Sequence, residues 1–382
     1  MILIIQNLRA NADTSTPPSN GATPSLPEVY RSIEVPKTAS GWRRFLAFLG
    51  PGYLVSVGYM DPGNWATDIE AGSKHGYALL WVILAASLAA MVLQTLSARL
   101  GLITRKDLAR LCRDHYSPPV NRGLWLMAEL SIIACDVAEV LGAALALHLL
   151  FGVSLLVGVA ITAFDTVIVL GLKGHGFRQV EAIILGLLAT IGACFAVQLA
   201  LVGPAWSAVI AGFMPSPAIL SQQEMLYLAI GIIGATVMPH NLYLHSSIVQ
   251  TRKVADDDAS RRDALRLSTV DALGSLALAM VMNAAILTLA ASAFHATGHQ
   301  DVSDIGDAHQ LLGPVVGTTL APILFGLALL ADQLVVMQDG RVVGQGFSHD
   351  PALHRLIESV FEHRIRIRGV ESQWVVLPCL GP

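Results

Sequence analysis

A helix-breaking acidic stretch inside an apolar segment is the feature that most limits how this chain can fold. Residues 45–71 are long and apolar enough to span a bilayer, yet they contain Asp61-Pro62-Gly63-Asn64 in their middle. A carboxylate at this depth is costly and usually functional. Pro and Gly interrupt a helix, and broken backbone is tolerated in a bilayer only where it packs in protein or lines a cavity. The stretch therefore predicts a broken membrane helix whose gap has a function.

A second apolar segment, residues 225–250, contains a similar interruption. It reads Ala235-Thr236-Val237-Met238-Pro239-His240-Asn241, so that Pro and Asn again stand inside a hydrophobic run. Interrupted helices in corresponding places of two halves of a chain are the best sequence indication of a transporter's binding site. We therefore expect the two breaks to meet.

The composition predicts an integral membrane protein. The chain of 382 residues is 54% hydrophobic and only 14% charged, whereas soluble domains have about 25% charged residues. A membrane helix needs about 20 apolar residues. Eight segments meet this requirement: 45–71 (broken), 77–101, 123–149, 153–172, 180–202, 225–250 (broken), 268–294 and 314–331.

Lysine and arginine alternate between the predicted loops. They precede the first span and follow the second, fourth and sixth, whereas the loops after the third, fifth and seventh contain none. Basic loops stay in the cytoplasm, so the N-terminus and the end of the last span are expected to be cytoplasmic. The expected location is the inner membrane of a bacterial cell.

The two ends of the chain differ from the apolar middle. Residues 1–40 are rich in Pro, Ser, Thr and Asn and are expected to form a disordered cytoplasmic tail. After Ala331, two short β-rich runs flank Asp339-Gly340, which is typical of a hairpin. Helical spacing over 351–362 and a last strand at 374–377 complete a small cytoplasmic α+β tail, residues 332–382.

The side chains at the two breaks are typical of a metal site. Asp61 offers a carboxylate, Asn64 an amide oxygen, Met238 a thioether, and the unwound turn near Ala235 a free carbonyl. Oxygen donors alone suit Mg²⁺ or Ca²⁺, and a thioether favours softer transition metals. The residues also allow simpler interpretations, because methionines often fill cores and a membrane proline often only kinks its helix.

Protonatable side chains accompany the breaks. His240 and His245 follow the second one, and a histidine can couple proton movement to another ion. Glu129, Asp136 and Glu139 recur near one face of the third span, where they predict an aqueous proton path or buried ion pairs. Asp68 and Glu70, after the first break, either line an outer vestibule or are solvated.

The two broken stretches resemble those of the Nramp family of proton-coupled manganese and iron transporters. The similar segments are 52–65 and 234–246, and the resemblance extends over about 27–331. It implies an all-α, LeuT-like fold of two inverted five-helix repeats. It also implies a metal site of Asp61, Asn64, Met238 and the Ala235 carbonyl. The same resemblance assigns proton movement and gating to His240, His245, Glu129, Asp136 and Glu139. It places Arg252 in a cytoplasmic ion-pair network.

The chain departs from that family after Ala331, where members continue with further helices. Residues 332–382 instead resemble the C-terminal end of an ABC-transporter ATP-binding subunit. The expected division is therefore a tail (1–40), an Nramp-like membrane domain (41–331) and an ABC-ATPase-like fragment (332–382). Within the membrane domain, 45–202 form the first repeat and 225–331 an incomplete second repeat, so that about eight helices are expected.

The main functional hypothesis is import of Mn²⁺ or Fe²⁺ by alternating access, with protons as the coupling ion. The alternatives are a truncated or fused relic that binds metal without transporting it, a membrane partner of an ABC-type importer, and a sodium-coupled amino-acid carrier. The expected partners are the metal ion and the bilayer, with no enzymatic activity, permanently bound cofactor or nucleic acid. The chain has no Gly-x-x-x-x-Gly-Lys-Ser/Thr motif for a nucleotide phosphate. Homo-oligomerisation is compatible with the sequence.

Overall fold

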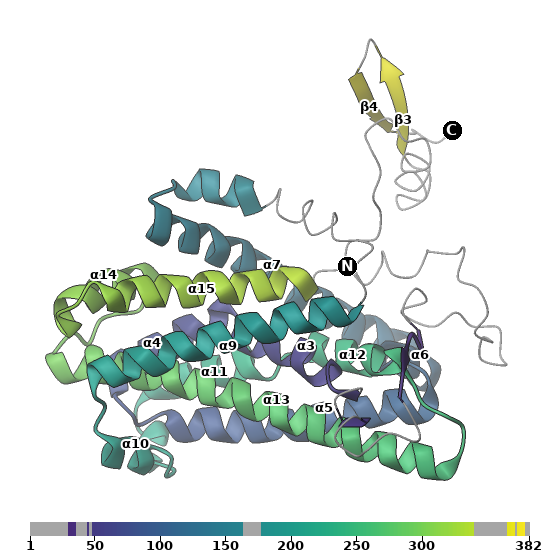
Figure 1. The fold of residues 1–382 in the computed structure, drawn as a ribbon, viewed down its shortest axis with the longest axis horizontal. Coiled ribbons are helices and arrows are strands. Elements are labelled where there is room, and N and C mark those ends of the chain that lie inside the picture. The colour runs from purple at the N-terminus through teal and green to yellow at the C-terminus, as the bar shows by residue number, and fades with distance from the viewer. Residues whose placement is uncertain are drawn as a thin grey trace.

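The fold is taken from a computed structural model, which describes residues 30–35, 44–45, 48–162, 177–339, 365–370 and 373–378. Long helices run roughly along a common direction and form one bundle (Figure 1).

Both predicted breaks are present in this bundle. The first separates α3 (Pro51–Val57) and the short 3-10 helix η1 (Gly58–Met60) from α4 (Pro62–His75). The second separates α11 (Gln223–Thr236) from α12 (Pro239–Ile248). In each break an extended residue, Asp61 or Met238, precedes a proline at the first helical position, where a missing N–H is harmless and the fixed φ suits a helix start.

The remaining elements complete the bundle and its ends. The longer helices are α5 (Leu80–Thr104), α7 (Pro118–Phe151), α9 (Phe177–Val202), α13 (Asp258–Ala293) and α15 (Leu320–Asp339). Shorter ones are α6 (Leu108–His115), α10 (Trp206–Gly212), α14 (Ile305–Val316), η2 (Pro217–Leu220), η3 (Val249–Thr251) and η4 (His295–Thr297). Strand β1 (Ile33–Glu34) pairs in parallel with β2 (Arg252–Lys253), and β3 (Ile365–Val370) pairs antiparallel with β4 (Gln373–Pro378).

Most of the predicted spans correspond to helices of the structure. Among the described residues, five helical segments are long and apolar enough to cross a membrane, namely 80–104, 118–151, 184–202, 223–251 and 258–297. The first predicted span is divided between α3 and α4, each of which is shorter than a bilayer crossing. The last corresponds to α15, and the second half of the predicted span 153–172 lies outside the described residues.

The tail differs in part from the sequence-based expectation. The predicted strand before Asp339 is wrong, because α15 continues as a helix to that residue. The predicted last strand is confirmed by β4. The predicted helix over 351–362 lies outside the described residues.

Helix α13 organises the packing around the breaks. It packs against α3, α4, α5 and α9, while α15 packs against α7 and α9. Trp65 is fully buried and contacts Phe195 and Phe325, with both ring-centroid separations 5.2 Å. Its indole N–H donates to the Met60 carbonyl at 3.1 Å. One aromatic side chain therefore fixes the first break against α9 and α15.

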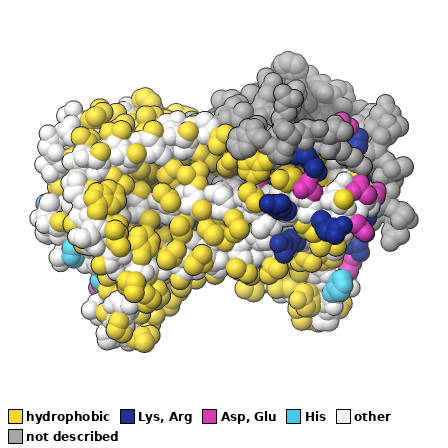
Figure 2. All heavy atoms as spheres, turned by 60° about the horizontal axis from the view of Figure 1, so that its bottom comes forward, with side chains coloured by type: hydrophobic (Ala, Val, Ile, Leu, Met, Phe, Trp, Pro, Cys, Tyr) yellow, Lys and Arg dark blue, Asp and Glu magenta, His cyan; other side chains and the backbone are white. Residues whose placement is uncertain are grey.

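The face of the molecule seen in Figure 2 is apolar except at one end. Figure 2 shows hydrophobic side chains over much of one face, with Lys and Arg gathered toward one end. Large apolar side chains on α7 are exposed, among them Leu130 and Leu141 at 58% each. Such a surface suits lipid rather than water.

The burial of Trp65 leads to a test of the packing. Trp65→Ala should lower the free energy of unfolding by about 3–5 kcal/mol, because it removes a large buried side chain and leaves a cavity. Trp206→Ala is the matched control, since that tryptophan is 58% exposed and should change stability little. Thermal unfolding of both variants in detergent measures the difference, and equal losses would contradict the proposed packing.

Candidate metal site

The first break places the Asp61 carboxylate over the start of α4. One oxygen, Oδ1, accepts hydrogen bonds from the Asn64 backbone N–H at 2.9 Å and from the Asn64 side-chain amide at 2.8 Å. Asp61 is thus the N-cap of α4, a position that favours Asp and an anionic charge. The side chain is only 6% exposed.

Asn64 joins the first break to the second. Its Nδ2 also donates to the backbone carbonyl of Ala235 at 3.1 Å, in the last turn of α11. One amide group therefore binds an oxygen from each broken helix. Three of the four predicted ligand residues, Asp61, Asn64 and Ala235, are brought together in this way.

Met238 occupies the second break itself, as the N-cap of α12. Its sulfur accepts from the Asn241 amide at 3.5 Å. The same amide lies against Gly58 of η1, where a Cβ would collide with it. Asn241 therefore stands between the thioether and the first break, and a side chain at position 58 would displace its amide.

Two polar residues that the sequence analysis did not single out also surround Asn64. Asn283 of α13 donates to the Tyr59 carbonyl at 2.8 Å and lies 3.4 Å from Asn64 Oδ1, while Thr236 Oγ1 lies 3.5 Å from the same oxygen. Asn283 is the single amide side chain inside the predicted span 268–294. A lone amide in a membrane span was a usable sequence signal.

The two predicted histidines differ in their surroundings. His245 is 1% exposed, and its Nδ1 lies 3.0 Å from Gln94 Oε1. Gln94 donates in turn to the Tyr59 hydroxyl at 2.8 Å, which connects α12 to η1 through α5. His240 is half-buried, and its Nδ1 has no hydrogen-bond partner among the described residues. Gln94 was also missed from the sequence, although it is a buried amide within a predicted span.

The three acids of α7 do not behave as one group. Glu139 is half-buried, accepts from the Cys135 thiol at 3.2 Å and interacts electrostatically with Asp61. Asp136 is exposed, and Glu129 is half-buried. Of the three, Glu139 is therefore the acid that the structure associates with the first break.

Arg252 lies at the start of α3 rather than at the breaks. It is 2% exposed, and its guanidinium donates to the carbonyls of Phe48 at 3.1 Å and Leu49 at 2.6 Å. Asp271 of α13 accepts from the Gly52 N–H at 2.7 Å in the same region. A buried cation and a buried carboxylate thus hold the backbone where α3 begins.

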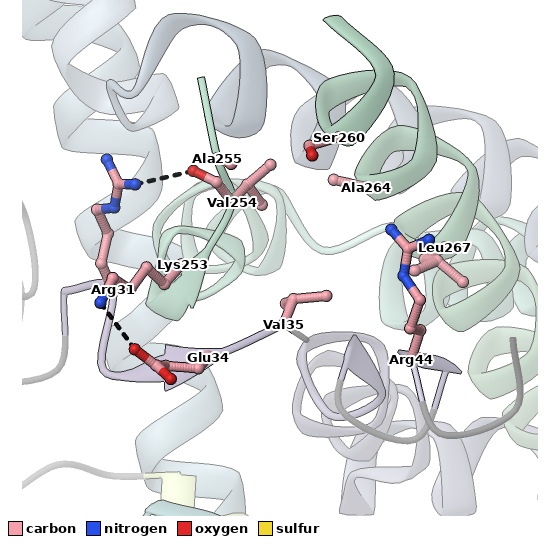
Figure 3. A pocket seen from close by; sticks show the side chains of 10 residues that line it. All are labelled: Arg31, Glu34, Val35, Arg44, Lys253, Val254, Ala255, Ser260, Ala264 and Leu267. Carbon is pink, nitrogen blue, oxygen red and sulfur yellow. Dashed lines mark hydrogen bonds and ion pairs between the residues drawn. The ribbon is translucent and has the colours of Figure 1, made fainter. Parts of the chain in front are cut away.

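A separate cavity of about 360 Å³ lies at the basic end of the molecule, between β1–β2 and the first turns of α13 (Figure 3). Its cationic side chains have partners: Arg31 donates to the Val254 carbonyl at 2.8 Å, Lys253 to Glu34 at 2.8 Å, and Arg44 pairs with Asp263. The Lys253 ammonium keeps the pKa of Glu34 below its ordinary value. This cavity contains none of the predicted metal ligands.

The meeting point of the breaks has the character of a small cation site. It combines a carboxylate, backbone and amide oxygens, and a nearby thioether, all in a buried setting. The Asn64 NH₂ group donates to Asp61 and Ala235, the same oxygens that a cation would bind. Rotation of this amide by a half-turn would present its oxygen instead, since the two ends of the amide have the same shape.

Comparisons with known proteins agree with this arrangement. Residues 52–350 match the model of the family described as Nramp, natural resistance-associated macrophage protein-like. The chain is 62% identical to the divalent metal cation transporter MntH of Ralstonia nicotianae over 318 residues, which cover 83% of this chain and 72% of that one. It is 60% identical to MntH 1 of Pseudomonas aeruginosa over 329 residues, 86% of this chain and 75% of the relative.

Solved structures of similar proteins lead to the same family. A crystal structure of the Eremococcus coleocola manganese transporter, in a variant form, matches with a TM-score of 0.76 and 38% identity, covering 82% of this chain and 67% of that one. A complex of that transporter with an aromatic bis-isothiourea compound matches with a TM-score of 0.75 and 36% identity, covering 90% and 71%.

These comparisons also bear on the predicted boundary in the tail. The family match continues to residue 350, beyond the predicted boundary at 331. The resemblance of residues 332–382 to an ABC-transporter ATPase subunit is not borne out by the comparisons. The continuation of α15 to Asp339 agrees with the longer match.

The sulfur at the second break leads to a test of selectivity. Met238→Ala should reduce the preference for Cd²⁺ over Ca²⁺ by about tenfold or more, because removing the thioether leaves only hard oxygen donors. Met225→Ala is the control, since Met225 is buried in α11 away from the break. Competition between the two metals in equilibrium binding measures the effect, and an unchanged preference in Met238→Ala would contradict the role of the sulfur.

Proposed function

Because the chain belongs to the Nramp family, we propose that it imports Mn²⁺ or Fe²⁺ across a bacterial inner membrane with protons as the coupling ion. The relatives carry the names of divalent metal and manganese transporters, and the five apolar helices among the described residues mark this chain as a multi-pass membrane protein. The proposal adds the metal ligands, the coupling ion and the mechanism to that family assignment.

The observation that carries the proposal is the pair of hydrogen bonds that the Asn64 side-chain amide donates. This amide connects Asp61 Oδ1 of one broken helix to the Ala235 carbonyl of the other. A hydrogen-bond donor held between two oxygens marks a place that favours positive charge. In our proposal a divalent ion takes this place, with Asp61, Asn64, the Ala235 carbonyl and Met238 as ligands.

The proposed mechanism is alternating access around this site. In this mechanism the ion crosses the protein through the site at the two breaks. One side of the site leads to the end near η4, and the other leads to the basic end near the start of α3. Rocking of helices against one another would expose the ion to each end in turn. Arg252 and Asp271 hold the start of α3, so we propose that they stabilise the state in which the basic end is closed.

Protons are proposed to move through the groups that adjoin Asp61. Glu139 interacts electrostatically with Asp61, and His245 connects to η1 through Gln94 and Tyr59. A divalent cation bound at Asp61 disfavours a proton on the same carboxylate. A proton released from Asp61 then needs a nearby acceptor. We propose Glu139 as this acceptor, and the further members of the path are His245, His240, Glu129 and Asp136.

The remaining parts of the proposal concern orientation and partners. The Lys and Arg side chains at one end of the bundle (Figure 2) support a cytoplasmic N-terminus. The transported ion is the only metal the protein needs, and we propose no catalysis and no nucleotide or nucleic-acid partner. We keep the proposed division of the chain into residues 1–40, 41–331 and 332–382. Homo-oligomerisation is compatible with the proposed function.

The site leads directly to a test of transport. Asp61→Ala should abolish Mn²⁺ uptake into proteoliposomes with an inside-negative, acid-outside gradient, because the carboxylate is the only anionic ligand proposed. Asp114→Ala is the control, since Asp114 is an exposed acid of α6 paired with Lys106. Equal uptake by wild type and Asp61→Ala would contradict the proposal. Mn²⁺ binding without uptake in the wild type would favour a metal-binding protein that does not transport.

Proton coupling has a separate test. Glu139→Gln should reduce the number of protons that enter per Mn²⁺ several-fold while Mn²⁺ uptake persists, because the amide cannot accept a proton. Asp114→Asn serves as the control, since Asp114 is an exposed acid of α6 paired with Lys106 and lies outside the proposed path. A pH-sensitive dye inside the proteoliposomes reports the protons. Unchanged stoichiometry in Glu139→Gln would remove this residue from the proton path.

A further inference from the structure

A second buried carboxylate follows Asp61 on α4. Asp68 is only 1% exposed, and its Oδ2 has no hydrogen-bond partner among the described residues. Burying a carboxylate without a donor or a countercharge is strongly unfavourable. Something other than the described side chains must therefore satisfy this oxygen in the working protein.

The position of Asp68 on its helix places it in line with the break. It comes about two turns after Asp61 and about one turn after Asn64, so the three side chains share one strip of α4. Asp68 interacts electrostatically with Asp61. Two like charges at this range in a low-dielectric setting repel each other, and a cation that binds Asp68 would relieve this repulsion.

Helix α13 covers this strip on both sides of Asp68. Before it, Asn64 contacts Asn283. After it, Gly72 packs directly on the Leu287 carbonyl and the Ala290 methyl group, where a Cβ has no room. Asp68 therefore lies along the α4–α13 interface, between these two contacts.

Asn283 supplies a second oxygen without a donor. Its Nδ2 binds the Tyr59 carbonyl, and its Oδ1 has no hydrogen-bond partner among the described residues, although the residue is only 2% exposed. Two buried acceptor oxygens, one anionic and one neutral, thus occur on facing strips of α4 and α13. This combination suits a hard cation, and it contains no sulfur.

We infer that Asp68, together with the Asn283 amide oxygen, forms a second divalent-cation station between the broken-helix site and the η4 end of the molecule. The inference rests on the proposed function. The last turn of α4 meets η4, because Gly76 lies against His295, whereas the basic cavity adjoins the start of α13. An ion that enters from the η4 end passes the Asp68 station before it reaches Asp61.

The two stations differ in the metals they distinguish. The station at the breaks includes the Met238 thioether and favours softer metals, whereas oxygen donors bind Ca²⁺ and Mn²⁺ alike. The Asp68 station is therefore a weaker and less selective site. The metal is selected afterwards, when the ion reaches the station at the breaks.

Equilibrium binding of ⁵⁴Mn²⁺ to the detergent-solubilised full chain tests this inference in five proteins: wild type, Asp61→Ala, Asp68→Asn, the double variant and Asp68→Glu. Asp61→Ala should lose the tighter phase, which Cd²⁺ displaces, and keep a phase about tenfold weaker that Ca²⁺ displaces. Asp68→Asn should lose only the weaker phase, and the double variant should lose both. Asp68→Glu should retain the weaker phase, because it preserves the carboxylate.

The outcomes separate this inference from the proposed function. Equal residual binding in Asp61→Ala and in the double variant would overturn the Asp68 station, and would indicate that a proton satisfies this carboxyl. Equal binding in wild type and Asp61→Ala would instead overturn the site at the breaks, and the comparison of Asp61→Ala with the double variant would still decide on Asp68. Elution of each variant as a single symmetric peak shows that the losses do not come from misfolding.

Discussion

The contact on which this structure depends is the Asn64 amide between Asp61 and the Ala235 carbonyl. Both helices are interrupted there, so the freed backbone groups need partners inside the protein. The interruptions therefore stabilise each other where they meet. Trp65, the next residue, fixes the same turn against Phe195 and Phe325. The candidate metal site and the packing of the bundle thus share one short stretch of chain.

Helix α13 gives this stretch its surroundings. Asp271, near the end of its first third, binds the backbone where α3 begins. Asn283 donates to the Tyr59 carbonyl in η1 and to the Asn64 amide oxygen. Farther along, Leu287 and Ala290 pack against Gly72 of α4. One long helix therefore contacts the first broken helix at its start, at its break and near its end. A movement of α3 relative to α4 would alter several of these contacts together, as the proposed alternating access requires.

The sequence was most informative about the breaks and less so about what surrounds them. An acidic residue and two prolines stand inside apolar runs, namely Asp61, Pro62 and Pro239. These local exceptions located both interruptions. Gln94 and Asn283 join the site through contacts between distant segments, which periodicity does not reveal. The strand predicted before Asp339 failed because the Val-rich run at 334–337 has high strand propensity, but tertiary context outweighs propensity and the run continues α15.

Anomalous diffraction from crystals of the protein soaked with Mn²⁺ is the most direct test of the central claim. We predict a strong peak between the two breaks, with Asp61, the Ala235 carbonyl and Met238 around it and the Asn64 amide turned to present its oxygen. A strong peak elsewhere, for example in the basic cavity of Figure 3, with none between the breaks, would contradict the claim that the two interruptions form the metal site.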